Sequence, residues 1–282
     1  MTIKNITVIG AGTMGAGIAR AAAASGFTVR LEDRDQAKAA TALDQIRGGL
    51  ENQVARGKLD GDEKAAIISR LSLCGCLEEC RDADLVVEAV AEREEVKKEI
   101  FRALDRLCPP HTILASNTSS ISITRLGGVT GRADRVIGMH FMNPAHVMKL
   151  VEVIAGLQTS SETVETVTRV AGRMGKTPVV VNDAPGFVAN RMLMPMINDA
   201  IFCLQEGIAT REDIDAIARL GAHHPMGPLE LADFIGLDVC LEILKVLHAE
   251  LGEKYRPGTL LRNMVAAGKL GRKSGAGFYD YD

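Results

Sequence analysis

Short apolar runs alternate with longer stretches of helical periodicity along residues 1–185. Runs of four to eight apolar residues are typical of buried strands, and recurrence every three or four residues is typical of helices that cover a sheet. The pattern predicts strands at residues 6–10, 27–33, 83–90, 112–119, 135–141, 149–156 and 177–183. It predicts helices between the first two strands and at residues 35–57, 93–107 and 161–174, with a short helix capped by Asp60 or Asp62. This alternation indicates a Rossmann-type, doubly wound α/β sheet.

The pattern changes at "DAPGFVANR", residues 183–191, where Pro185-Gly186 interrupts the chain. Little strand pattern follows, and helices are predicted at residues 187–206, 211–219, 228–250 and 259–267, with glycines at helix ends (Gly207, Gly221 and Gly252). The sequence therefore predicts two domains, an α/β domain over 1–185 and a smaller all-helical domain over 186–282.

Composition narrows the classes of partner. The 282 residues carry a net charge of -3, so no broad basic surface for nucleic acid or an anionic membrane is expected. We find no apolar run of about 18 residues and no secretory signal, which favours a cytoplasmic protein without a membrane span. The six cysteines include a cluster, Cys74, Cys76 and Cys80, but no matching second ligand pair. Free thiols in a reducing compartment are the simpler interpretation, and no metal is predicted.

The stretch "ITVIGAGTMGAGIA" places Gly10, Gly12 and Gly15 between the first predicted strand and a helix. In this context the three glycines allow a tight turn, a close approach of the backbone to a pyrophosphate, and close packing of helix on strand. Asp33 ends the second strand, where a carboxylate binds the adenosine ribose and repels a 2′-phosphate. We therefore predict NAD as the cofactor, with the neighbouring Arg34 able to weaken the discrimination against NADP.

A dehydrogenase needs a base for the hydroxyl proton, and histidine suits that role near neutral pH. Among six histidines, His140 stands out because it lies at the end of a predicted sheet strand. Glu152 lies in the middle of the next apolar strand, "KLVEVIAG". If these strands are antiparallel neighbours, Glu152 fixes the tautomer of His140 and stabilises its imidazolium. Spacing alone leaves a surface glutamate and a structural histidine as an equally good interpretation.

The chain resembles the 3-hydroxyacyl-CoA dehydrogenase family over essentially its whole length. The resemblance is carried, in order, by "GAGTMGAGIA", "VVEAVAE", "SNTSS", "GMHFMNP", "KLVEV", "PGFVANR", "GAHHPMGPLEL" and "GKLGRKSGAGFYDY". It is strongest to the single-function bacterial branch that acts on 3-hydroxybutyryl-CoA. The resemblance implies an NAD-dependent enzyme with a coenzyme A thioester substrate.

The resemblance also implies roles for individual residues. His140 is expected to be the general base and Glu152 its partner. Ser119 is expected to contact the substrate 3-oxygen, and Asn190 the thioester carbonyl near the histidine. Asn143 is expected to help position the substrate.

Other implied roles concern the cofactor and coenzyme A. Glu92, Lys97 and Asn117 match family residues near the nicotinamide end of the cofactor, although each also fits an ordinary turn or helix position. Arg56 is expected to meet the coenzyme A phosphates, since arginine binds phosphate well. Asn52 departs from a lysine-rich pattern in this helix, and a solvated helix face is the alternative interpretation.

The C-terminal helices resemble the family's dimerisation domain. The apolar runs "MLMPMI" and "LELADFIGLDVCLEIL" exceed what a small domain needs for its own core, so a homodimer or a higher homo-oligomer is expected.

Three alternatives remain. A β-hydroxyacid dehydrogenase uses a lysine base after its first domain, where this chain has Asn190-Arg191. A sugar-acid dehydrogenase of related fold needs no contacts with coenzyme A. A non-catalytic relative binds the dinucleotide without turnover.

Overall fold

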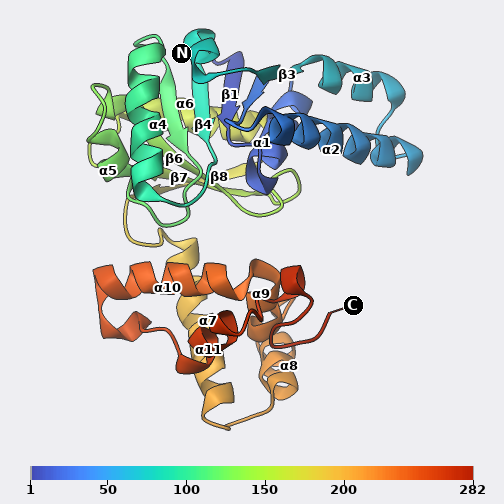
Figure 1. Ribbon diagram of the computed structural model, residues 1–282, viewed down its shortest axis with the longest axis vertical. Coiled ribbons are helices and arrows are strands. Elements are labelled where there is room, and N and C mark those ends of the chain that lie inside the picture. The colour runs from blue at the N-terminus through green and yellow to red at the C-terminus, as the bar shows by residue number, and fades with distance from the viewer. Residues whose placement is uncertain (1, 282) are drawn as a thin grey trace. The chain divides into compact units, whose positions relative to one another are not determined.

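We describe residues 2–281 from a computed structural model, which divides into two compact units (Figure 1). The first unit extends to Asp183 and the second begins at Ala184. No helix among the described residues is both long and apolar enough to cross a membrane. Each unit is described by itself.

The first unit is built on one eight-stranded sheet of order β3-β2-β1-β4-β5-β6-β7-β8. Neighbouring strands are parallel except for the antiparallel pair β6–β7. The strands are β1 (Asn5–Ile9), β2 (Thr28–Glu32), β3 (Leu71–Cys74), β4 (Leu85–Glu88), β5 (Ile113–Ser116), β6 (Val136–Phe141), β7 (Leu150–Ala155) and β8 (Thr177–Asn182). This arrangement confirms the predicted Rossmann-type sheet.

Helices pack on the sheet wherever the sequence presents an apolar stripe (Figure 1). Side chains cap several of these helices at the N-terminus: Asp35 accepts from the amides of Ala37 and Lys38, and Asp60 accepts from the amide of Glu63. Asp60 is thus the cap of the short predicted helix. The helices are α1 (Thr13–Ala24), α2 (Gln36–Ala55), α3 (Gly61–Ser69), α4 (Glu94–Leu107), α5 (Ile123–Gly127) and α6 (Ser161–Arg173), with 3-10 turns η1 (Leu77–Asp82) and η2 (Ala133–Arg135).

The strand order reverses between β1 and β4, which are hydrogen-bonded neighbours. The chain leaves β1 toward β2 on one side and later returns through β4 on the other. Ligands of such sheets bind in the crevice outside the carboxyl ends of the strands at this switch point. The carboxyl end of β6 lies along the same edge, because β1, β4, β5 and β6 are parallel.

The second unit is helical. It contains α7 (Ala189–Gln205), α8 (Arg211–Gly221), α9 (Pro228–Ile235), α10 (Leu237–Leu251) and α11 (Thr259–Ala266), with 3-10 turns η3 (Glu253–Tyr255) and η4 (Arg272–Ser274). The single helix predicted over 228–250 is wrong, because Gly236 has a φ of 104° and separates α9 from α10. Gly207 and Gly252 follow their helices with positive φ, whereas Gly221 is the last residue of α8.

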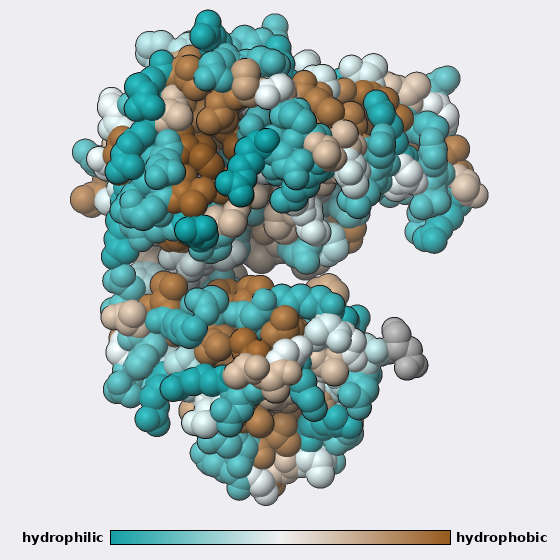
Figure 2. All heavy atoms as spheres, viewed as in Figure 1, coloured by the Kyte–Doolittle hydropathy of each residue, from teal (hydrophilic) through white to brown (hydrophobic). Residues whose placement is uncertain are grey.

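Both units have apolar side chains at the surface. Figure 2 shows hydrophobic residues beside α4 on the visible face of the first unit and below α10 on the second. In the second unit the most exposed large apolar side chains are Met192, Ile208, Ile217 and Leu220, each at least 67% exposed. They lie outside the unit's own core, which α7, α9, α10 and α11 share.

Candidate active site

The turn from β1 into α1 depends on glycine at two positions. Gly10 has a φ of 99°, and a Cβ there would lie 2.6 Å from the carbonyl oxygen of Ala89, the residue after the neighbouring strand β4. A Cβ on Gly15 would lie 1.7 Å from the carbonyl oxygen of Gly10, so α1 packs directly on the turn. At Gly12 the space is open, with no protein atom within 4 Å of a built Cβ. Backbone can therefore approach a ligand there.

Asp33 follows β2 and is held in place by the same turn. Its Oδ2 accepts from the amide of Ala11 at 2.8 Å, and its Oδ1 accepts from the amide of Asp35 at 3.1 Å. Lys38 lies 3.7 Å from Oδ2. Burial alone would raise the pKa of Asp33, but these amides and the Lys38 charge lower it below its ordinary value. The carboxylate is therefore ionised at neutral pH.

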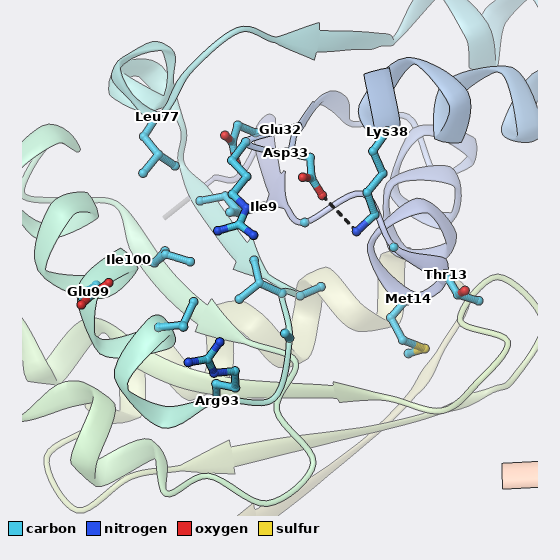
Figure 3. A pocket seen from close by; sticks show the side chains of 17 residues that line it. Ile9, Thr13, Met14, Glu32, Asp33, Lys38, Leu77, Arg93, Glu99 and Ile100 are labelled. Carbon is cyan, nitrogen blue, oxygen red and sulfur yellow. Dashed lines mark ion pairs between the residues drawn. The ribbon is translucent and has the colours of Figure 1, made fainter. Parts of the chain in front are cut away.

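A cavity of about 640 Å³ lies at this switch point (Figure 3). It is bounded by the glycine turn, the end of β2 and the first half of α4. Its wall contains polar and charged side chains as well as apolar ones. Its residues include Gly10, Gly12, Asp33, Arg34, Lys38, Leu77, Val96 and Ile100. The open approach at Gly12, the amides of the turn and the ionised Asp33 fit the phosphates and the ribose of a dinucleotide.

His140 and Glu152 lie directly opposite each other in the antiparallel pair β6–β7. Opposed residues place their side chains on one face of a sheet. His140 Nδ1 lies 2.8 Å from Glu152 Oε2, and both residues are buried, at 5% and 2% exposed. A carboxylate can only accept, so Nδ1 is expected to carry the proton of this bond, and Nε2 is left able to take up another.

Ser119 lies on the other side of the imidazole. Its Oγ is 3.0 Å from His140 Nε2. Glu152, His140 and Ser119 therefore form one hydrogen-bonded line at the carboxyl end of β6. Such a line can take a proton at Nε2 while the buried carboxylate stabilises the resulting charge.

A buried ion pair lies behind Ser119. Lys97 is 1% exposed, and its Nζ donates to Glu88 Oε1 at 2.6 Å. Glu88 is fully buried; its Oε1 also accepts from the amide of Val90, and its Oε2 accepts from Ser116 Oγ at 2.6 Å. The pair is thus surrounded by the hydrogen bonds that a buried charge requires.

Glu92 connects this pair to the turn that contains Ser119. Lys97 Nζ lies 3.3 Å from Glu92 Oε2. Glu92 Oε1 accepts from the amides of Ser119 at 2.8 Å and Ser120 at 3.0 Å, and from the Thr118 hydroxyl. Desolvation would raise the pKa of Glu92, but the Lys97 charge and these hydrogen bonds lower it.

Asn117, the residue after β5, makes a contact with β6 beside His140. Its side-chain oxygen accepts from the amide of Phe141, the residue after His140, at 2.9 Å. Three residues at or after the end of β5 thus contact different parts of the site: Ser116 binds Glu88, Asn117 binds Phe141, and Ser119 binds His140. The predicted contact of Asn117 with the cofactor stays a prediction.

The β6–β7 loop is anchored by a lysine that the sequence interpretation did not select. Lys176 Nζ donates to the carbonyls of Ala145 at 2.6 Å and Met148 at 2.8 Å. Burial lowers the pKa of Lys176. Asn143, exposed in this loop, precedes a cis peptide bond to Pro144.

The remaining predicted residues lie elsewhere. Arg56 is exposed at the C-terminal end of α2. Asn190 belongs to the second unit, where it is buried at the start of α7. Their predicted roles in substrate binding stay predictions.

The sequence did not single out Lys176 or Glu88 as site residues. Glu32, which also lines the cavity, was passed over in favour of Asp33 because neighbouring residues of a strand face opposite sides. A charged residue within or at the end of an apolar run in the sequence is a signal that could have identified such buried groups. Glu88 ends an apolar strand, "LVVE", as Glu32 ends "TVRLE". Lys176 carries no such pattern.

The switch-point cavity and the buried histidine–glutamate pair together define a dinucleotide-dependent dehydrogenase. Residues 5–184 match the NAD-binding domain of 3-hydroxyacyl-CoA dehydrogenase, and residues 186–281 match its C-terminal domain. The chain belongs to the 3-hydroxyacyl-CoA dehydrogenase family, whose enzymes are NAD-dependent oxidoreductases.

Named relatives match over nearly the full length. The chain is 57% identical to a probable 3-hydroxybutyryl-CoA dehydrogenase of Bacillus subtilis (strain 168), covering 100% of this chain and 99% of the relative. It is 50% identical to a 3-hydroxybutyryl-CoA dehydrogenase of Bradyrhizobium diazoefficiens, covering 99% and 96%. The crystal structure of the (S)-3-hydroxybutyryl-CoA dehydrogenase from Ralstonia eutropha superposes with a TM-score of 0.96 at 45% identity, covering both chains completely.

Proposed function

We propose that the protein is an NAD-dependent (S)-3-hydroxyacyl-CoA dehydrogenase that interconverts 3-hydroxybutyryl-CoA and acetoacetyl-CoA. The observation that carries the proposal is the hydrogen-bonded line of Glu152, His140 and Ser119 at the sheet edge that also bears the dinucleotide cavity. The names of the full-length relatives support the substrate. The reaction is reversible, and the same groups serve both directions.

The chain's own residues handle the proton. NAD, when bound, supplies the hydride acceptor for C3 of the substrate. In the oxidation, His140 Nε2 takes the 3-hydroxyl proton as the C3–O bond becomes a ketone. Glu152 holds Nδ1–H and stabilises the imidazolium, while the Ser119 hydroxyl, beside Nε2, orients the 3-oxygen. In the reduction the imidazolium returns its proton.

Several residues are proposed for substrate binding. Asn143 and Asn190 offer amide groups to the thioester, as the family resemblance implies. Arg56 offers a guanidinium to the coenzyme A phosphates, which its exposure permits.

Glu92, Lys97 and Asn117 are proposed to shape the nicotinamide end of the site. The contacts of Glu92 with residues 118–120 and of Asn117 with Phe141 support a role in placing Ser119 and His140.

We also propose that the protein works as a homodimer through the second unit's helices, supported by their exposed apolar side chains. The six cysteines form no disulfide, which fits the reducing cytoplasm expected from the sequence. Light scattering on the purified protein measures the oligomeric state.

The test is an assay of NADH oxidation with acetoacetyl-CoA, longer 3-ketoacyl-CoAs and free acetoacetate. We expect turnover of the thioesters only, with acetoacetyl-CoA among the preferred substrates. His140→Ala is expected to lower kcat by about a hundredfold to ten-thousandfold and to leave NADH affinity unchanged. Glu152→Gln keeps the shape of the side chain but removes its charge, and is expected to lower kcat by about tenfold or more.

His111→Ala is the matched control, because His111 is exposed and near Asp84, away from the site. Turnover of free acids without coenzyme A would favour a β-hydroxyacid or sugar-acid dehydrogenase. Binding of NADH without turnover of any substrate would favour a non-catalytic relative. A His140→Ala variant with wild-type kcat would refute the proposed base.

A further inference from the structure

The dinucleotide cavity contains a second carboxylate beside Asp33. Glu32 is the last residue of β2 and lines the cavity together with the apolar side chains of Leu77, Val96 and Ile100. Figure 3 shows the two carboxylates turned to different sides, Asp33 toward Lys38 and Glu32 toward Leu77. One carboxylate of the cavity therefore lies toward Lys38 and another toward Leu77.

Glu32 differs from the other buried acids of this unit in its contacts. It is 6% exposed, yet among residues 2–281 its carboxylate has neither a hydrogen bond nor an ion pair to another side chain or amide. Asp33, Glu88 and Glu152 all have such partners. Burial, followed by the charge of Asp33, raises the pKa of Glu32. A buried acceptor without a donor is costly, so a donor brought by a ligand would be favourable.

The position of Glu32 selects which part of the cofactor can supply that donor. Asp33 and the glycine turn are suited to the ribose and the phosphates, which leaves the side of the cavity near Leu77, Val96 and Ile100 for the adenine ring. Adenine presents an exocyclic amine as a donor, next to ring nitrogens that only accept. An ionised carboxylate only accepts. The amine is therefore the part of the base that complements Glu32.

We propose that Glu32 accepts a hydrogen bond from the exocyclic amine of the cofactor's adenine and makes this site selective for an adenine dinucleotide. The inference concerns NAD binding alone and does not depend on the proposed acyl substrate. It assigns the two neighbouring acids different tasks, the ribose to Asp33 and the base to Glu32.

The experiment compares equilibrium binding of NADH and deamino-NADH, which carries hypoxanthine in place of adenine. Hypoxanthine presents a carbonyl oxygen where adenine has its amine, so it places an acceptor against Glu32. Isothermal titration calorimetry without acyl substrate gives both dissociation constants. We expect the wild-type protein to bind NADH about tenfold to a hundredfold more tightly than deamino-NADH, as for a hydrogen bond to a charged group.

Two variants and a control separate the hydrogen bond from packing. Glu32→Met keeps the length of the side chain but removes the acceptor, and is expected to bring the ratio of the two dissociation constants close to one. Glu32→Gln offers both an acceptor and a donor, and is expected to give an intermediate ratio by improving deamino-NADH binding. Glu99→Gln is the control, since Glu99 lines the same cavity but is exposed, and its ratio should equal the wild-type ratio.

Equal wild-type affinities for the two dinucleotides would overturn the proposal. A Glu32→Met protein that is folded and keeps the wild-type ratio would also overturn it. If Glu32→Met does not fold, the wild-type and Glu32→Gln ratios decide the outcome, because an unchanged ratio in Glu32→Gln contradicts an acceptor role.

Discussion

Individual site residues of the first unit are held by partners that only the folded chain brings close. Glu92 contacts Ser119, which lies 27 positions away in the sequence, and Lys97 contacts Glu88 across the start of α4. Because Ser119 Oγ lies 3.0 Å from His140 Nε2, a displacement of Glu92 is expected to disturb that contact. Glu92 is therefore expected to be a positioning residue, whether or not it also contacts the cofactor.

Glu92→Gln tests this positioning role. The amide loses the charge that faces Lys97 and turns a donor toward one of its neighbours, so residues 118–120 should shift. A misplacement of about 1 Å at a reacting group costs up to about a hundredfold in rate, and we expect kcat to fall by about tenfold or more. NADH affinity, measured by fluorescence titration, should stay within about twofold if Glu92 acts through Ser119.

Glu95→Gln is the control, since Glu95 is 75% exposed and its pair with Lys98 contributes little. Loss of NADH affinity in Glu92→Gln with an unchanged kcat would instead support the cofactor contact that the family resemblance implies.

Contacts between individual residues are easier to predict from the sequence when they lie in neighbouring strands than when they depend on how distant elements pack. The pairing of His140 with Glu152 was one of two equally good interpretations of the spacing, and it holds because β6 and β7 are antiparallel neighbours in which the two residues lie opposite each other. The burial of Lys97 was not predictable, because it depends on how α4 packs against β4. Successive residues of a strand point to opposite faces, so Glu32 and Asp33 are expected to turn away from each other. The two side chains do point to different sides (Figure 3), but the cavity extends around the end of β2, so both line it.

The helices and strands follow the hydrophobic pattern closely, and the exceptions have physical causes. The pattern of residues 228–250 is helical throughout, and the only sign of the break is Gly236, which a helix interior can also tolerate. The short helix α5 was not predicted, because its five residues are too few to show a period.

The turn between β1 and α1 is crowded at Gly15 and open at Gly12. Gly15→Ala places a methyl group 1.7 Å from a backbone oxygen, so α1 must move away from the turn. We expect a lower melting temperature and NADH binding weakened by about tenfold or more, because the turn amides lose their positions. Gly12→Ala meets no protein atom within 4 Å and starts from a φ of -72°, which alanine adopts freely.

Gly12→Ala should therefore melt like the wild-type protein and yet bind NADH weakly, since its methyl group points into the space for the pyrophosphate. Thermal melts and NADH titrations on both variants make the comparison. Equal NADH affinity in Gly12→Ala and the wild-type protein would contradict the assignment of the turn.

At the scale of the whole molecule, two units with separate cores divide the tasks. Every residue that lines the dinucleotide cavity belongs to the first unit. The sequence marks the transition at Pro185-Gly186, close to the point where the two compact units meet in the chain. The second unit uses its C-terminal segment, "GAGFYDY", to complete its own core: Phe278 is buried there against α9 and α10.

The C-terminal segment is fastened to α9 by Asp233, which is 1% exposed. Its Oδ1 accepts from the amide of Phe278 at 2.9 Å. Its Oδ2 accepts from the amide of Tyr279 at 2.9 Å and from the Tyr281 hydroxyl at 3.0 Å. A methyl group on Gly277 would lie 2.0 Å from Oδ1, so the segment approaches the carboxylate as closely as glycine allows.

Asp233→Asn should separate stability from cofactor binding. Asparagine has one acceptor oxygen in place of two and sets its amide group against a donor, which costs about 1–3 kcal/mol of unfolding free energy. The second unit should melt several degrees lower, while the NADH dissociation constant stays unchanged because the cavity lies in the other unit. Asp238→Asn is the control, since its pair with Lys273 is at the surface.

The pH dependence of the same variant gives an independent check. Burial raises the pKa of Asp233 above its ordinary value. Between the ordinary and the raised value the folded chain binds more protons than the unfolded chain, so this part of the stability falls as pH rises through that window. Asp233→Asn removes the titrating group and should flatten the dependence in thermal melts over that range. A variant that melts like the wild-type protein at every pH would show that the C-terminal segment is held by its apolar contacts alone.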